Sequence, residues 1–219
     1  IASRCREYTG VDYSSSMIEA CRARFGETDR LRFEIGDARK LKFRPNTFDF
    51  VLFSFNGIDY VSHEDRLIAF SEIVRVTKPG GLVVFSTHNI HSIGARRLLR
   101  RIIRLDLEEI WRQLFIFSFN RTKRIAGEPH AEAVRDMPTL RTYYIAHAAQ
   151  IAQLESVGLE YVRAYSLETG AALTEKQAEA ADDKWLYYWA SKPLLSPIGA
   201  NSANTIGIVW VLLSEIGFV

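Results

Sequence analysis

Two aspartates stand directly after segments that read as strands, Asp12 after residues 8–11 and Asp37 after residues 31–35. Ligands of open parallel sheets bind at the carboxyl ends of strands. A carboxylate after the first strand can accept hydrogen bonds from a ribose diol, and one after the next can accept from an exocyclic amine, with the Ala38 N–H donating to a ring nitrogen. One strand–helix–strand unit separates the two aspartates, so both can face one crevice. The alternative is that each aspartate only caps a strand end.

The segments around these residues alternate between strand and helix patterns. Apolar or alternating runs predict strands, and apolar spacing after a serine cap predicts helices. Strands are expected at 8–12, 31–35, 48–53, 82–87, 159–167 and 184–191, and helices from Ser14–Ser16 to 25, over 64–77 and over 144–157. The Lys78-Pro79-Gly80-Gly81 segment should end the second helix.

This order predicts an α/β fold of three layers, α/β/α: a Rossmann-like, doubly wound, mostly parallel sheet with right-handed crossovers. The late pair of strands, rich in Tyr, Val and Trp, is expected to close the sheet with an antiparallel edge strand. Residues 1–192 are expected to form one domain, with an insertion at 94–140 and a tail at 193–219.

Three sequence strings appear in order and at fitting distances: GVDYSSSMI, FEIGDARKLKFRPNTFDFVLF and EIVRVTKPGGLVVFSTHN. The chain resembles the class I S-adenosylmethionine-dependent methyltransferases in these strings. The resemblance covers residues 5–92 well and residues 143–192 more loosely.

The resemblance implies that S-adenosylmethionine is the cofactor and assigns positions around it. Asp12 matches the ribose ligand, and Asp37 the acceptor of the adenine amine, with Ala38 as its backbone partner. Tyr13 and Met17 match positions that flank the adenine, although Met17 as a plain core residue is the alternative. The remaining positions, where the family's chain passes the methionine moiety and the substrate, are Ser54, Phe55 and Asn56.

Methyl transfer needs a protein base only if the acceptor loses a proton, because the cofactor supplies the electrophile. His88, which ends the fifth strand of the family pattern, and Asn56 are the candidates for catalytic residues. The alternative for His88 is a hydrogen-bonded structural histidine. His91, His130 and His147 show no ligand spacing, so we expect no metal site.

The glycine-rich turn that is the family's strongest motif is not in the sequence, since no GxGxG occurs anywhere. Counting back from Asp12 places that turn before residue 1. The prediction is an N-terminally truncated domain without its first strand and glycine loop, whose sheet has two buried edges unpaired. A circular permutation that uses the tail WVLLSEIGFV as the first strand is the less favoured alternative.

The insertion and the tail have contrasting compositions. Residues 94–124 hold nine Arg or Lys and three acidic residues, a net charge of +6, and residues 96–104 have amphipathic helical spacing. A lid over an apolar acceptor pocket is expected there, with an anionic acceptor or a membrane surface as alternatives. The tail carries no charge from residue 193 to 214, and its apolar core at 206–213 is shorter than the ~20 residues of a membrane span, so no stable span is expected.

The whole composition is that of a globular protein, with 47% hydrophobic and 25% charged residues. A net charge of +2 argues against a nucleic-acid partner, and two cysteines without a signal-peptide core favour the cytoplasm. The leading hypothesis is methyl transfer to a small-molecule acceptor. The alternatives are a non-catalytic remnant of the same fold and a nicotinamide-dependent oxidoreductase.

Overall fold

The computed structural model describes residues 5–93, 107, 110, 111, 114, 130–134, 141–194 and 207–212 of the 219-residue chain. Its ordered part begins with β1 (Glu7–Asp12), α1 (Ser15–Phe25), β2 (Leu31–Ile35) and β3 (Phe48–Ser54). The short 3-10 helix η2 (Gly57–Tyr60), helix α2 (His63–Val76), strand β4 (Thr77–Asn89) and η3 (Ile90–Ile93) follow.

The described part of the second half includes two antiparallel strand pairs and two helices. Strands β5 (His130–Val134) and β6 (Arg141–Ile145) pair with each other, and α5 (His147–Ser156) comes next. The remaining elements are β7 (Glu160–Ser166), β8 (Ala172–Leu173), α6 (Glu175–Ala180), β9 (Trp185–Ser191) and β10 (Gly207–Leu212).

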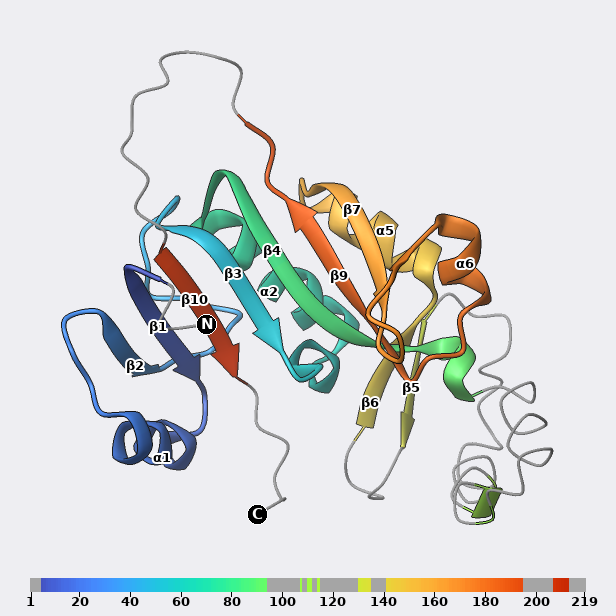
Figure 1. Cartoon of the computed structure of the whole chain (residues 1–219), viewed down its shortest axis with the longest axis horizontal. Coiled ribbons are helices and arrows are strands. Elements are labelled where there is room, and N and C mark those ends of the chain that lie inside the picture. The colour runs from blue at the N-terminus through green and yellow to red at the C-terminus, as the bar shows by residue number, and fades with distance from the viewer. Residues whose placement is uncertain are drawn as a thin grey trace.

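These strands form one sheet in the order β2-β1-β10-β3-β4-β9-β7-β8 (Figure 1). The first five strands of this order are parallel to one another, whereas β9 pairs antiparallel with both β4 and β7. The predicted mostly parallel sheet with an antiparallel edge is therefore confirmed.

Helices cover the two faces of this sheet. The chain moves from β1 to β2 in one direction along the sheet and from β3 to β4 in the other, so right-handed crossovers place α1 and α2 on opposite faces. The core is divided accordingly, with Tyr8, Ile18, Cys21 and Phe33 on the α1 face. The predicted three-layer architecture follows from this division.

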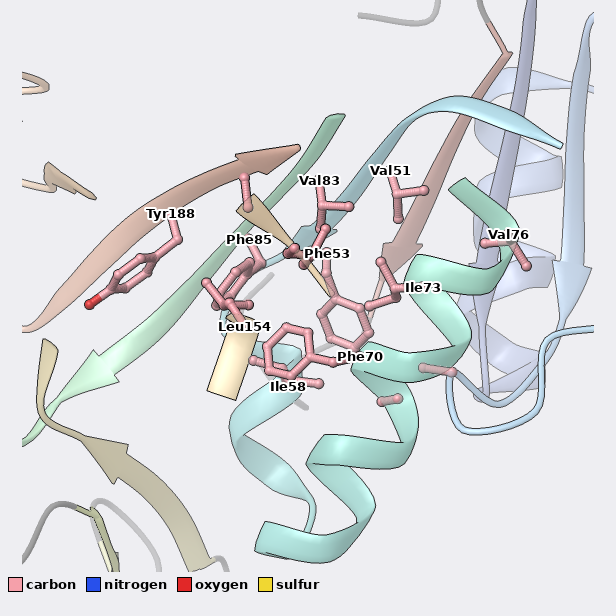
Figure 2. Packing of buried hydrophobic residues seen from close by; sticks show 14 of the residues in the cluster. Val51, Phe53, Ile58, Phe70, Ile73, Val76, Val83, Phe85, Leu154 and Tyr188 are labelled. Atoms are coloured by element: carbon pink, nitrogen blue, oxygen red, sulfur yellow. The ribbon is translucent and has the colours of Figure 1, made fainter. Parts of the chain in front are cut away.

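The larger core lies between the sheet and α2 (Figure 2). Phe70 and Ile73 of α2 are fully buried against Val51 and Phe53 of β3 and against Phe85 of β4. The Phe70 and Phe85 rings meet edge to face with centroids 4.9 Å apart, a favoured aromatic geometry. This packing fixes the carboxyl ends of β3 and β4 relative to each other.

The strand between β1 and β3 shows that one prediction was wrong. The two buried edges that the sequence seemed to leave unpaired are both paired, because β10 lies between β1 and β3 and is parallel to both (Figure 1). Its apolar segment Ile208–Leu212 supplies N–H and C=O groups to two neighbouring strands, which satisfies backbone groups that would otherwise be buried without partners.

Two local expectations also need correction. The insertion at 94–140, for which no strand was expected, contains strand β5. The helix expected over 144–157 begins only at His147, because Tyr144 belongs to β6. The alternating Arg-Thr-Tyr-Tyr-Ile segment has strand propensity, and its pairing with β4 and β5 decides its conformation. Most of the predicted lid at 94–124 lies outside the described residues.

Candidate active site

The carboxyl ends of four neighbouring strands meet at one edge of the sheet. Asp12 is paired in register with Ile35, Val11 with Val211, and Leu212 with Ser54. The residues that follow β1, β2 and β3 therefore leave the sheet at the same edge, at the place where ligands of open parallel sheets bind.

Asp12 is fully buried at the end of β1. Its Oδ1 accepts a 2.7 Å hydrogen bond from the Ser14 N–H, and the Ser14 hydroxyl in turn caps α1 by accepting from Met17 N–H at 3.4 Å. Burial, with a further contribution from the Asp12 carboxylate, raises the pKa of the nearby Cys21 thiol. A buried carboxylate is costly unless it is compensated, so Asp12 is a strong candidate for a binding residue.

Asp37 lies in the turn after β2, which packs closely against β1. Gly36 N–H donates to Asp12 C=O at 2.9 Å, and a Cβ at Gly36 would lie only 2.9 Å from Val11 Cγ1. The glycine thus allows the two strand ends to approach, while Ala38 is buried next to them.

The Asp37 carboxylate is held by Arg39. It accepts from the Arg39 backbone N–H at 2.8 Å and from the Arg39 guanidinium at 2.7 Å, and these side-chain hydrogen bonds lower the pKa of Asp37. Arg39 also donates to Asp65 at 2.8 Å, which ties this turn to the start of α2. An adenine amine at Asp37 would have to share the carboxylate with Arg39.

The turn after β3 adopts an uncommon backbone conformation. Phe55 and Asn56 both have left-handed φ values, 53° and 55°, and the Phe55 side chain is exposed whereas Ser54 is buried. Consecutive non-glycine residues of this kind store strain, which gathers at ligand-binding sites. Asn56 is 2% exposed, and its Oδ1 has no hydrogen-bond partner among the described residues.

Two residues predicted to flank an adenine lie at the start of α1. Tyr13 is exposed, and Met17 is partly buried against the Tyr8, Ile18, Cys21 and Phe33 cluster. This packing fits the core alternative for Met17, and its role beside the cofactor stays a prediction.

His88 is brought together with two residues that the sequence analysis missed. Asp59 Oδ2 accepts from the His88 backbone N–H at 2.6 Å and lies 2.8 Å from His88 Nδ1. Asp59 also forms a fully buried ion pair with Arg66 of α2. Arg66 stands four and seven residues before Phe70 and Ile73, on the apolar face of α2, and that position was the signal that could have identified it.

A second group of polar aromatic residues lies beside this one. His63 Nδ1 is 2.7 Å from the Tyr143 hydroxyl, and the His63 ring stacks on that of His130 with centroids 4.4 Å apart. Among the residues with a described structure, no group of three His, Cys, Asp or Glu side chains is placed to hold a metal ion.

The polar residues at the crevice fit an S-adenosyl cofactor. The buried Asp12 carboxylate and the Asn56 Oδ1 atom, which has no partner among the described residues, are acceptors of the kind that a ribose diol and an amine require. A separate pocket on β7 and β9, lined by Tyr165, Tyr187 and Trp189, contains none of the predicted site residues.

Comparison with known proteins gives a family match for the first part of the chain. Residues 1–81 match the family described as Methyltransferase domain. Demethylmenaquinone methyltransferases of Staphylococcus aureus are 40% identical over 78 residues, which is 36% of this chain and 31% of the relative. The matched segment thus spans about a third of the length of these curated relatives.

Solved structures are similar over most of the chain. A SAM-dependent methyltransferase of Methanosarcina mazei matches with a TM-score of 0.56 and 19% identity, covering 89% of this chain and 85% of that one. A Thermotoga maritima protein described as a possible histamine N-methyltransferase matches with a TM-score of 0.53 and 16% identity, covering 84% and 72% of the two chains. At this identity the likeness concerns the fold.

The family match over residues 1–81 and the fold both support the class expected from the sequence, the class I S-adenosylmethionine-dependent methyltransferases. The expected fold is confirmed, and the methyltransferase resemblance is confirmed for residues 1–81, whereas the roles of individual residues stay predictions. No helix in the described ranges is long and apolar enough to span a membrane.

Proposed function

We propose that the protein transfers a methyl group from S-adenosylmethionine to a small-molecule acceptor at the carboxyl edge formed by β1, β2 and β3. The observation that carries the proposal is the placement of buried Asp12 in the family fold, at the end of the strand that precedes α1. The bound cofactor would supply an electrophilic methyl group on a sulfonium.

Asp12 would accept the ribose hydroxyls, and Asp37 with the Ala38 N–H would recognise the adenine. Ser54, Phe55 and Asn56 would line the path of the methionine moiety, with the Asn56 Oδ1 atom as an acceptor for an ammonium or hydroxyl group. Tyr13 and Met17 lie at the start of α1, next to Asp12, where they would flank the adenine.

His88 would act as the base for an acceptor that must lose a proton. The acceptor's lone pair forms the new bond to carbon while the carbon–sulfur bond breaks and its electron pair remains on sulfur. The acceptor proton passes to His88, whose charged form is balanced by Asp59 2.8 Å away. An acceptor hydroxyl, such as that of a phenol, fits this chemistry. The relatives that share the first part of the chain are demethylmenaquinone methyltransferases, whose name indicates a small-molecule acceptor.

Calorimetric titration of S-adenosylhomocysteine into the 219-residue chain tests the cofactor site. Asp12→Asn and Asn56→Ala should each weaken binding about tenfold or more, because each removes a hydrogen bond to the ligand. Asp49→Asn is the matched control, since Asp49 pairs with Lys78 away from this edge. Equal affinity in all four proteins would overturn the assignment.

NADH and NAD⁺ in the same titration separate the oxidoreductase alternative. Binding of a dinucleotide in preference to S-adenosylhomocysteine would favour that alternative, and a folded chain that binds neither would favour a non-catalytic remnant. The family match supports the S-adenosyl cofactor.

A further inference from the structure

We propose that Asp59 is a positioning residue that fixes the orientation and tautomer of His88, and that Arg66 holds Asp59 in place for this task. The inference rests on the proposed function, in which His88 takes a proton from the methyl acceptor. Its structural basis is a buried hydrogen-bond network. In it, every acceptor position of the Asp59 carboxylate and every N–H donor of the Arg66 guanidinium has a partner.

The Asp59 carboxylate has four hydrogen-bond partners. A carboxylate can accept about four hydrogen bonds, two at each oxygen. Its Oδ1 accepts from the Arg66 guanidinium and from the Thr87 hydroxyl, the latter at 2.6 Å. Its Oδ2 accepts from the His88 backbone N–H and faces His88 Nδ1. With all four positions filled, the carboxylate has one orientation.

Arg66 uses all five of its N–H groups. Nη1 donates to Asp59 and to Ile58 C=O, and Nη2 donates to Thr87 Oγ1 at 2.9 Å and to Gln150 Oε1 at 2.5 Å. The fifth donor, Nε, reaches Gln153 Oε1 at 3.1 Å. The guanidinium carbon also lies 4.6 Å from the centre of the Tyr143 ring. The hydrogen bonds thus hold the edge of the guanidinium plane, and the Tyr143 ring holds its face.

The consequence for His88 follows from the chemistry of a carboxylate. An ionised carboxylate only accepts hydrogen bonds, so Nδ1 of His88 must carry the proton that points to Asp59. Nε2 is then the basic nitrogen of the neutral ring. An aspartate that holds a histidine in this tautomer also stabilises the imidazolium formed when Nε2 accepts a proton.

The surroundings of His88 leave little room for the ring to turn. His88 is 1% exposed, and its ring meets Trp185 of β9 edge to face and lies 5.2 Å from Tyr144 of β6. Asp59 from η2 and Tyr144 face the ring, and Arg66 lies one step behind Asp59. The carboxylate lies at Nδ1 itself, so it is the group that we expect to select the tautomer.

The test is nitrogen-15 NMR of the histidine rings in the full chain, with and without Asp59→Asn. In the unmodified protein, we expect Nδ1 of His88 to show the shift of a protonated nitrogen and Nε2 that of an unprotonated one. The opposite tautomer of His88 in the unmodified protein would overturn the proposal. The proposal can therefore be tested even if the Asp59→Asn variant fails to fold.

In Asp59→Asn one carboxylate oxygen is replaced by an NH2 group, which donates hydrogen bonds and does not accept them, so either the His88 tautomer changes or the Arg66 contact is lost. We expect a changed His88 spectrum and at least a tenfold fall in kcat with a short-chain demethylmenaquinol analogue, with affinity for S-adenosylhomocysteine unchanged within about twofold. Glu72→Gln, which removes the same charge from an arginine-paired carboxylate at the other end of α2, should change none of these.

An unchanged His88 spectrum in folded Asp59→Asn, or a loss of kcat no larger than in Glu72→Gln, would overturn the proposal. Absence of S-adenosylhomocysteine binding in the unmodified chain would instead overturn the proposed function, and the tautomer measurement would still decide the role of Asp59. If the quinol analogue is not methylated by the unmodified protein, the tautomer is the deciding readout.

Discussion

The Asn56 backbone N–H donates a 3.1 Å hydrogen bond to the Ser86 hydroxyl, which joins the left-handed turn after β3 to the end of β4. Both partners are buried, so the turn is held in its strained conformation by the strand next to it. Ser86 stands two residues before His88 in β4, so the bond also connects Asn56 to the strand that carries His88. The residues predicted for the cofactor and for proton transfer are thus mechanically connected.

Replacing Phe55 by glycine should raise stability and lower cofactor affinity. Glycine adopts φ near 53° without the steric cost of a side chain, which amounts to about 1 kcal/mol. The same change loosens a turn that would line the methionine path. Thermal unfolding and calorimetry with S-adenosylhomocysteine measure the two effects.

Tyr161→Gly is the control for this prediction. Tyr161 is also an exposed aromatic residue with a left-handed φ, 52°, but it lies in β7. It should gain stability with no change in affinity. If Phe55→Gly behaves in the same way, the strain at Phe55 has no bearing on the cofactor.

Arg66→Gln should destabilise the protein by about 3–5 kcal/mol, because removal of one partner leaves the Asp59 charge buried without compensation. Arg75→Gln, at a partly exposed position of the same helix that pairs with Glu72, should cost far less. Urea unfolding of both variants checks the difference. A similar loss of unfolding free energy in the two variants would contradict the prediction that burial makes the Asp59–Arg66 pair the more costly one to break.

Stability should fall as the pH drops below about 6.5, with His147 contributing to the loss. Burial lowers the pKa of folded His147 against the opposing charges of Glu179 and Glu175, and its Nδ1 lies 3.1 Å from the Tyr188 hydroxyl. Because the unfolded chain then binds the proton more readily than the folded one, acid favours unfolding. Urea unfolding at several pH values should show a shallower fall in His147→Gln.

The exposed His91 supplies the comparison for this pH effect. His91→Gln should keep the pH dependence of the unmodified protein. A His147→Gln profile that overlays that of His91→Gln would contradict the assignment to His147.

Proline at position 209 should weaken the centre of the sheet. Val209 is paired with Thr9 of β1 and with Val51 of β3, and proline removes the N–H of this central strand. The lost hydrogen bond alone costs about 1–3 kcal/mol. Hydrogen exchange should accelerate in both β1 and β3, whereas Val209→Thr, which keeps the N–H, should leave both protected.

Local patterns were sufficient for most elements that surround the crevice. Strand β2 has the predicted bounds, and α1 begins after the predicted cap Ser14, because apolar alternation and capping act over a few residues. The methyltransferase resemblance was also predictable, since it depends on three strings within residues 10–89, most of which lie in the matched residues 1–81.

The rest depended on contacts between distant segments. The His88–Asp59 pair joins residues 29 apart, and Arg66 meets Gln150 and Gln153 more than 80 residues away. The position of β10 between β1 and β3 likewise depends on pairing over the length of the chain. Side-chain type alone gives no information about such partners.

The position of β10 sets an order on the assembly of the sheet. The strand at its centre is the last of the described strands to leave the ribosome, so β1 and β3 must wait for a segment about 200 residues beyond β1 before their facing edges are joined. Contacts so far apart in sequence slow folding, and an open parallel edge in the meantime favours association with other chains. The speed of folding and the tendency to aggregate during synthesis should therefore be governed by the last part of the chain.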